Sequence, residues 1–209
     1  MKKLLIVLCC ILALQSCNNG NTGTETVNGF DINWSGDLNK NEQAAIKDMI
    51  SNMVKVEAGT FYMGAQKDSV EYYNYDESAT SWESPVHEVT LSEFYINKYE
   101  VTQALWKAVM GKHNDKKDEF DQWEDEFGKG DNYPAYRISF EEVETFIGKL
   151  NEYTGLNFAL PTEAQWEYAA RGGKDTNYAL YAGGDNVIEF AWIDSNSTKC
   201  NRKKYKRFI

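Results

Sequence analysis

The chain has 209 residues, of which 42% are hydrophobic and 14% aromatic, and this composition excludes a fully disordered protein. Its 32 acidic and 22 basic residues give a net charge of −10, which is the wrong sign for a protein that binds nucleic-acid phosphates. The length allows one substantial domain with additional segments.

Residues 1–16 have the pattern of a secretory signal peptide. Two lysines precede an apolar run over 4–14, which is too short to span a bilayer and suits the apolar region of a signal. The sequence Leu14-Gln-Ser-Cys17 resembles a bacterial lipobox, which predicts cleavage before Cys17 and lipidation of its thiol. An ordinary signal peptide is the alternative. Lipidation would leave Cys200 as the one free thiol of the mature chain.

A linker and a helix are predicted to follow the signal. Residues 17–37 are expected to be a flexible tether, because the stretch up to Asn33 is rich in Asn, Gly and Thr. Apolar residues then recur at helical spacing from Ile46 to Met53, which predicts an amphipathic helix over 38–52.

Short strands are predicted in the next part of the chain. Alternating apolar residues over 54–56 and 61–63 indicate two strands separated by a turn at Gly59-Thr60. The polar, acidic stretch 68–83 predicts a loop. Alternation resumes over 89–96, which indicates two more short strands.

Three further helices are marked by capping residues. Thr102 is expected to cap a helix that stops at Gly111, and a Ser-x-x-Glu box at 139–142 opens a helix that ends before Gly155. A second box at 162–165 opens a helix whose apolar face is expected to be Trp166, Ala169 and Ala170. Because no regular βαβ alternation appears, the predicted class is α+β.

The stretch 114–132 carries eight carboxylates. A cation site is one interpretation, since hard cations bind carboxylate oxygens. The spacing matches no known calcium loop, however, so a solvated insertion is the favoured interpretation.

Four stretches, in order, resemble the sulfatase-modifying-factor family, which contains the formylglycine-generating-enzyme-like domain. They are Met53-Val-Lys-Val-Glu-Ala-Gly-Thr-Phe-Tyr-Met-Gly64, Glu83-Ser-Pro-Val-His-Glu-Val-Thr-Leu91, Phe94-Tyr-Ile-Asn-Lys-Tyr-Glu-Val-Thr-Gln103 and Leu160-Pro-Thr-Glu-Ala-Gln-Trp-Glu-Tyr-Ala-Ala-Arg-Gly-Gly173. The last is the most specific, and it departs from the family pattern at Gln165; Ala159, just before it, is a second departure. The resemblance spans about 53–193, and the domain is predicted over 53–198.

The resemblance implies a fold related to C-type lectins, with short strands and two or three capped helices, incomplete at the C-terminus. Founding members of the family oxidise a sulfatase cysteine to formylglycine, using oxygen and copper held by two cysteine thiolates. Calcium also occurs in relatives. Other relatives are accessory lipoproteins or binding modules.

The residues of the family motifs are interpreted here as structural. His87 is one of two histidines and is expected to make a hydrogen bond at a strand start, since a metal site needs three or four ligands. Glu167 and Arg171 are expected to join Glu163 in a network on one helix face, with paired carboxylates for acid–base work as the alternative. The motif residues assigned a structural role are Glu100, Thr102, Thr162, Glu163, Trp166, Glu167 and Arg171.

The C-terminal segment breaks with what precedes it. Residues 199–209 contain six bases and no acids, whereas the other 198 residues have 16 bases and 32 acids. The family's Gly-Asn-Val-Trp-Glu-Trp motif and its copper cysteines are missing, so no catalytic or metal-binding residue and no cofactor is assigned. An interrupted reading frame would produce such a tail. The alternative is a short protein whose basic tail contacts anionic lipid or a partner. If the reading frame is interrupted, loss of the family's later segments would expose strand edges and apolar surface, which predicts marginal stability.

The sequence therefore predicts an envelope-anchored lipoprotein, at the outer membrane, whose domain lacks cysteine-oxidising activity in this form. A non-catalytic protein- or carbohydrate-binding module is one alternative, and a sulfatase-maturation enzyme is another. The expected partners are a membrane, through the lipid on Cys17, and a protein or glycan, but not nucleic acid.

Overall fold

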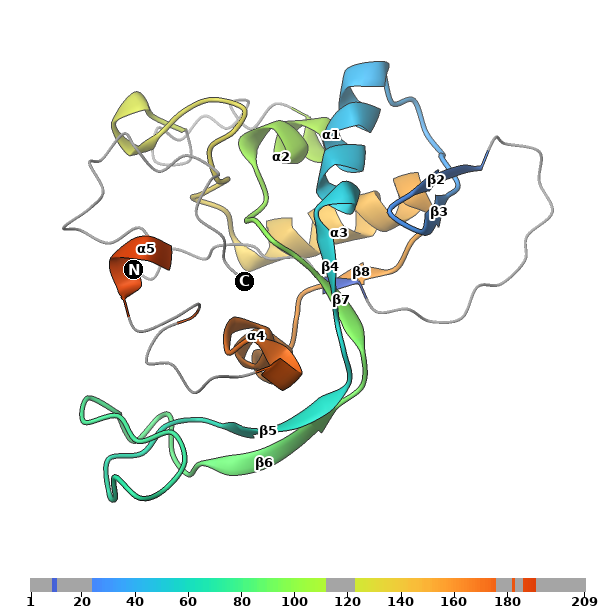
Figure 1. Ribbon diagram of the computed structural model, residues 1–209. Helices are drawn as coiled ribbons and strands as arrows, with labels where there is room; N and C mark the ends of the chain where they lie inside the picture. Colours follow the sequence, from blue (N-terminus) through green and yellow to red (C-terminus); the bar gives the residue numbers. More distant parts are fainter. Residues whose placement is uncertain (1–8, 11–23, 112–122, 176–181, 183–185, 191–209) are drawn as a thin grey trace.

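The computed structural model describes residues 9–10, 24–111, 123–175, 182 and 186–190, which form an α+β fold (Figure 1). The longer helices are α1 (Lys40–Ser51), α2 (Gln103–Met110), α3 (Phe140–Thr154) and α4 (Glu163–Ala170). The strands are β1 (Cys9–Cys10), β2 (Glu25–Val27), β3 (Phe30–Ile32), β4 (Met53–Val56), β5 (Gly59–Met63), β6 (His87–Leu91), β7 (Phe94–Asn97) and β8 (Phe158–Ala159). Short helical turns are η3 (Asp125–Phe127), η4 (Gly173–Asp175) and α5 (Val187–Phe190).

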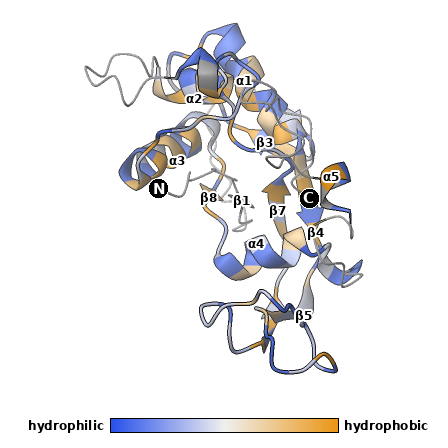
Figure 2. Ribbon diagram, turned by 90° about the vertical axis from the view of Figure 1, so that its left-hand side faces the viewer, coloured by the Kyte–Doolittle hydropathy of each residue, from blue (hydrophilic) through white to orange (hydrophobic). Residues whose placement is uncertain are grey.

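The centre of the fold is one long antiparallel ribbon. Its first half pairs β4 with β7, from Met53 opposite Asn97 to Val56 opposite Phe94. Its second half pairs β5 with β6 in the same register, and Met63 lies opposite His87. The two halves meet at a bend (Figure 1). The ribbon carries the β5–β6 half away from the helices α1, α2 and α3, which gather at the opposite end of the molecule (Figure 2).

The turn predicted at Gly59-Thr60 is wrong, because both residues lie in β5 and continue the ribbon. Gly59 has a different reason to be glycine. A Cβ built on it would lie 2.1 Å from the hydroxyl oxygen of Tyr168 on α4, so the strand approaches the helix more closely than any side chain permits.

The β4–β7 pair belongs to a four-stranded sheet in the order β4-β7-β1-β8. In it, β1 pairs antiparallel with both β7 and β8. Cys9 and Cys10 are the two described residues of the predicted signal segment, and the rest of residues 1–16 lie outside the described part. No helix among the described residues is both long and apolar enough to cross a membrane.

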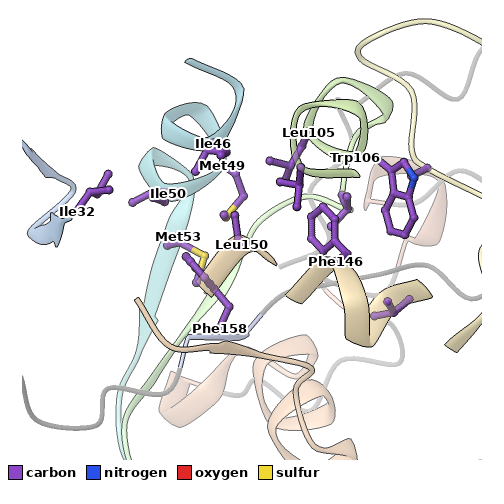
Figure 3. Close-up of a cluster of buried hydrophobic side chains, with 14 of the residues drawn as sticks. Ile32, Ile46, Met49, Ile50, Met53, Leu105, Trp106, Phe146, Leu150 and Phe158 are labelled. Carbon is purple, nitrogen blue, oxygen red and sulfur yellow. The ribbon is translucent and has the colours of Figure 1, made fainter. Parts of the chain in front are cut away.

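Helices α1, α2 and α3 enclose the larger core (Figure 3). Ile46 and Ile50 on α1 are fully buried, as are Phe146 and Leu150 on α3. The ring of Trp106 on α2 stacks on Phe146 with 5.0 Å between centroids and 4° between planes. The i, i+4 spacing that predicted these helices thus also forms the core.

Three of the helix caps are those the sequence predicted. Thr102 Oγ1 accepts a hydrogen bond from the Leu105 N–H, and Gly111 follows the last turn of α2 with φ +80°. Reciprocal capping boxes open α3 at Ser139 and α4 at Thr162. The predicted helix at 38–52 is α1, and it begins with a third box at Asn39. Each box satisfies backbone donors that the first helical turn leaves unpaired.

The predicted tether over 17–37 is wrong for residues 24–37. There β2 and β3 form a hairpin whose turn residues Asn28 and Gly29 both have positive φ, 52° and 81°. Asn-Gly is the preferred pair for such a turn. Phe30 and Ile32 on β3 are 5% and 0% exposed, so the hairpin belongs to the core, and the domain begins well before residue 53.

A buried glutamine organises the loop that follows α2. Gln103 is fully buried, and its side-chain amide donates to the carbonyls of Gly128 and Pro134 and accepts from the Gly130 N–H. Part of the acidic stretch 114–132 lies outside the described residues. Its described part folds back as η3, where Glu124 pairs with Arg137 at 2.5 Å.

A smaller core joins α4 to the ribbon. Tyr168 is fully buried there against Phe61, with 5.1 Å between ring centroids. Its hydroxyl is the one buried side-chain oxygen or nitrogen among the described residues that has no hydrogen-bond partner. Burial raises the pKa of this phenol. The hydroxyl faces Gly59 instead of a donor or acceptor.

We predict that Tyr168→Phe leaves the free energy of unfolding unchanged or raises it by about 1 kcal/mol, because it removes a desolvated hydroxyl that makes no hydrogen bond. Gly59→Ala should lower it by about 1–3 kcal/mol through overpacking. Because the clash is with the hydroxyl oxygen, the double variant should regain part of that loss. Chemical denaturation measures all three, and purely additive effects would contradict this packing.

Candidate functional site

The best-defined polar arrangement joins α4 to the far end of β5. One Glu167 carboxylate oxygen accepts hydrogen bonds from the Gly64 N–H at 2.9 Å and from Arg171 Nε at 2.8 Å. Arg171 also donates from Nη2 to the Gly64 carbonyl at 3.1 Å. Both side chains are largely buried, at 19% and 29% exposed. We name this arrangement the Glu167–Arg171 clamp, and it binds both backbone polar groups of one residue, Gly64.

Glycine is the only residue type that fits at position 64, between the clamp and Glu83. Its φ of +92° lies in the region that favours glycine. A Cβ there would lie 2.3 Å from the Glu83 carbonyl oxygen, a contact with backbone that nothing flexible can relieve. Glu83 and Ala65 are joined by a backbone hydrogen bond of 3.0 Å, which closes a loop at this point.

Residues 65–86, named here the aromatic loop, leave and return to the ribbon beside the clamp, and they project from its end (Figure 1). Polar side chains inside the loop hold its shape. Asn74, at φ +55°, donates to the carbonyls of Gly64 and Tyr62. Gln66 accepts from the N–H groups of Asp68 and Ser69 and donates to the Ser69 carbonyl. The sequence predicted a loop here, and the structure shows that it is ordered from within.

The aromatic loop presents large apolar side chains to solvent. Eight large hydrophobic side chains are exposed in the described part of the chain, and five of them are in this loop. They are Val70, Tyr72, Tyr73, Tyr75 and Trp82, with Trp82 95% exposed. Such a concentration on one ordered segment marks an interaction surface more often than a chance exposure.

The remaining motif residues of α4 lie around the clamp with other roles. Glu163 is exposed, so the predicted three-membered network contains only Glu167 and Arg171. Trp166 is 42% exposed, which corrects its predicted place on the apolar face. Tyr168 and Ala169 supply that face instead. Thr162 caps the helix, as predicted.

Glu100 and Thr102 lie at the other end of the ribbon from the aromatic loop, at a small pocket between α1 and α2. The pocket also includes Asp48, Asn52 and Asn97. Burial raises the pKa of Glu100, and its own backbone N–H opposes that effect by hydrogen bonding. Asn97 is committed to the fold, since it donates to the Met49 carbonyl at 2.7 Å and accepts from the Tyr99 N–H.

The described residues offer no set of metal ligands. Nowhere in the described ranges do three His, Cys, Asp or Glu side chains lie together as a metal site would require. His87 begins β6, and its Nδ1 lies 2.9 Å from the Pro85 carbonyl oxygen. Cys17 and Cys200 lie outside the described residues.

Comparison with known proteins identifies the family. The Sulfatase-modifying factor enzyme 1-like domain matches residues 38–207. The chain belongs to this family. Its α+β fold is thus the C-type-lectin-like fold of these domains. The matched range begins before the stretches quoted above, at the helix α1, and it takes in most of the basic segment.

This sulfatase-modifying-factor-like chain is similar to a chaperone protein and to a protein of known structure. The chaperone protein LppX of Paenibacillus barcinonensis is 36% identical over an alignment of 133 positions, and the match covers 52% of this chain and 47% of LppX. The structure of PvdO from Pseudomonas aeruginosa is 25% identical, covers 59% of this chain and 48% of PvdO, and has a TM-score of 0.45. The chain spans about half the length of each.

Sequence patterns alone missed several residues that define the site. Gly64 ends one of the family stretches, but nothing local shows that its peptide is the partner of Glu167, 103 residues away. Asn74 sits among tyrosines in a stretch without periodicity. The exposed aromatics had a visible signal, since 72–75 place three tyrosines in a polar segment.

We predict that Arg171→Met lowers the free energy of unfolding by about 1–3 kcal/mol, because it removes the charged donor that Arg171 provides to the partly buried Glu167 carboxylate and to the Gly64 carbonyl. It should also accelerate tryptic cleavage after Lys67, which is exposed in the aromatic loop. Lys55→Met is the matched control, since Lys55 pairs with Glu93 in an exposed ion pair on the same ribbon. That control should leave both the free energy of unfolding and the cleavage rate close to those of the wild type. Equal effects of the two variants would contradict the clamp.

Proposed function

We propose that this chain is a lipoprotein anchored in the bacterial envelope, at the outer membrane, and that its domain is a binding module for other exported proteins. The lipobox-like Leu14-Gln-Ser-Cys17 supports the anchor. The similarity to LppX, which is described as a chaperone protein, supports a role in contacting other polypeptides.

The aromatic loop is the observation that carries the proposal. Exposing large aromatic side chains costs solvation free energy, at roughly 25 cal/mol per Å² of apolar surface. In this chain the exposed rings lie on a loop whose backbone is fixed by the clamp, Asn74 and Gln66. The fold therefore keeps these side chains at the surface. Rigid, exposed Tyr and Trp are the side chains that most often anchor protein interfaces.

The clamp also weighs against an acid–base role for the paired carboxylates Glu163 and Glu167 of α4. Glu167 and Arg171 direct their polar atoms at the Gly64 peptide and at each other. Both are thus occupied in positioning the loop. This supports the structural interpretation of the motif over the catalytic one.

A cysteine oxidase of this family, as the resemblance implies, needs two thiolates for copper. If Cys17 is acylated and residues 1–16 are removed, Cys200 is the one remaining thiol in these 209 residues. We therefore propose that the chain does not itself make formylglycine. Formylglycine detected by mass in a Cys-x-Pro-x-Arg peptide incubated with the protein and copper would refute this part of the proposal.

Site-specific photo-crosslinking tests the binding module in cells. A benzophenone amino acid at Tyr72 or Trp82 should give discrete adducts with exported proteins. The same group at Phe140, which is 54% exposed at the start of α3, is the matched control and should give none. Adducts that form equally from all three positions, or from none, would contradict the proposal.

The anchor is tested in the same cells. Wild-type chain should appear in the outer-membrane fraction with a mass increase that corresponds to a lipidated Cys17, whereas Cys17→Ala should lose the increase and leave that fraction. Crosslinking through the loop should persist in solubilised wild-type protein, since the anchor and the loop are separate parts. Unchanged fractionation of Cys17→Ala would show that the lipobox interpretation is wrong.

A further inference from the structure

The charge of the aromatic loop is as distinctive as its exposed rings. Residues 65–86 contain five carboxylates and a single base, Lys67. Asp76 and Glu83 are kept ionised by local hydrogen bonds. The Ser78 hydroxyl and N–H lower the pKa of Asp76, and the Thr80 N–H and hydroxyl lower that of Glu83. The exposed rings therefore lie in a negative field.

The same chain shows what complements such a surface. Lys47 lies 5.8 Å from the centroid of the Trp34 ring and 2.8 Å from a Glu25 carboxylate oxygen. Glu25 also accepts a hydrogen bond from the Trp34 indole at 3.1 Å. A ring, a carboxylate and a cation thus form one contact, in which the ring face and the carboxylate both attract the ammonium group.

A second instance lies beside α2. Lys107 is 5.7 Å from the centroid of the Trp123 ring and 3.0 Å from an Asp131 carboxylate oxygen. In both instances a lysine on a helix contacts an aromatic ring and a carboxylate that lie outside that helix. The aromatic loop contains exposed rings and five carboxylates but only one cation of its own, Lys67.

We propose that the aromatic loop binds a lysine- or arginine-rich extended segment of another exported polypeptide. This inference rests on the proposed function and names the chemistry of its partner. The cationic side chains would lie against Tyr72, Tyr75 or Trp82 and pair with the neighbouring carboxylates. The charge complementarity favours a cationic occupant, because anionic lipid and nucleic acid are repelled by the same carboxylates that attract Lys and Arg side chains.

The stack of Tyr62 and Tyr73 supports a preformed surface. Their rings lie 3.9 Å apart at 11°, and they join the loop to strand β5. Because the loop is already ordered, a partner need not pay for ordering it on binding.

The test measures binding of the purified full chain to a synthetic peptide of alternating Arg and Ser, with a Glu/Ser peptide as the probe of opposite charge. Tyr72→Ser/Trp82→Ser should weaken binding of the Arg peptide about five- to thirty-fold. Glu71→Gln/Glu77→Gln should weaken it several-fold at low salt, and the difference should shrink as salt is added.

Glu144→Gln/Glu152→Gln is the matched control, because it changes the net charge equally at two exposed positions on α3. It should leave binding within about twofold of wild type. Equal binding of the Glu peptide, or equal weakening by the control pair, would overturn the proposal.

Crosslinking separates this inference from the function on which it rests. If adducts from Tyr72 and Trp82 survive in the Glu71→Gln/Glu77→Gln variant and map to segments without Lys or Arg, the cationic partner is refuted while the binding module stands. If no adducts form from the loop at all, both are refuted. Adducts that map to Lys- or Arg-rich segments and weaken in that variant support the inference.

Discussion

The backbone of one residue, Gly64, determines where the aromatic loop lies. Glu167 accepts its N–H and Arg171 donates to its carbonyl, so the C-terminal half of α4 holds the end of β5 through both polar groups of one residue. Charge-assisted bonds in a largely buried position are among the stronger polar contacts of a fold. The aromatic loop closes directly beside this point, through Ala65 and Glu83. The position of the exposed rings in this loop therefore depends on α4.

The rest of the architecture explains why such a clamp is needed. The helices α1, α2 and α3 enclose the larger core, which includes Met53 at the start of the ribbon. Val56 and its partner Phe94 already belong to the smaller cluster. Beyond the bend, the described contacts of β5 and β6 are with each other, α4, η4, the small cluster around Tyr168 and the aromatic loop. A two-stranded ribbon has little stability by itself in water. Tyr168 against Gly59 and the clamp at Gly64 fix its outer half from one helix face.

The sequence predicted the elements whose causes are local. Helix caps at Thr102, Ser139 and Thr162, and the loop over 68–83, follow from neighbouring residues. The family resemblance supplied the fold class, which membership confirms. The prediction at Gly59 was wrong because the constraint on this residue comes from a part of the chain far away in the sequence. Gly59 resembles a turn residue but is glycine because Tyr168 lies over it, 109 positions later in the chain. The hairpin at Asn28-Gly29 was hidden in a polar stretch, although Asn-Gly is itself the signal of a tight turn.

Hydrogen exchange at the Gly64 amide tests the central claim most directly. In the wild-type chain this amide should be protected to the level of the β5 amides, because it donates to a carboxylate held by Arg171. In Glu167→Met, the account predicts that Gly64 and the aromatic loop lose protection at least about tenfold, while Lys55 and Tyr95 in the β4–β7 half keep theirs. A Gly64 amide that exchanges at the same rate in both proteins would contradict it.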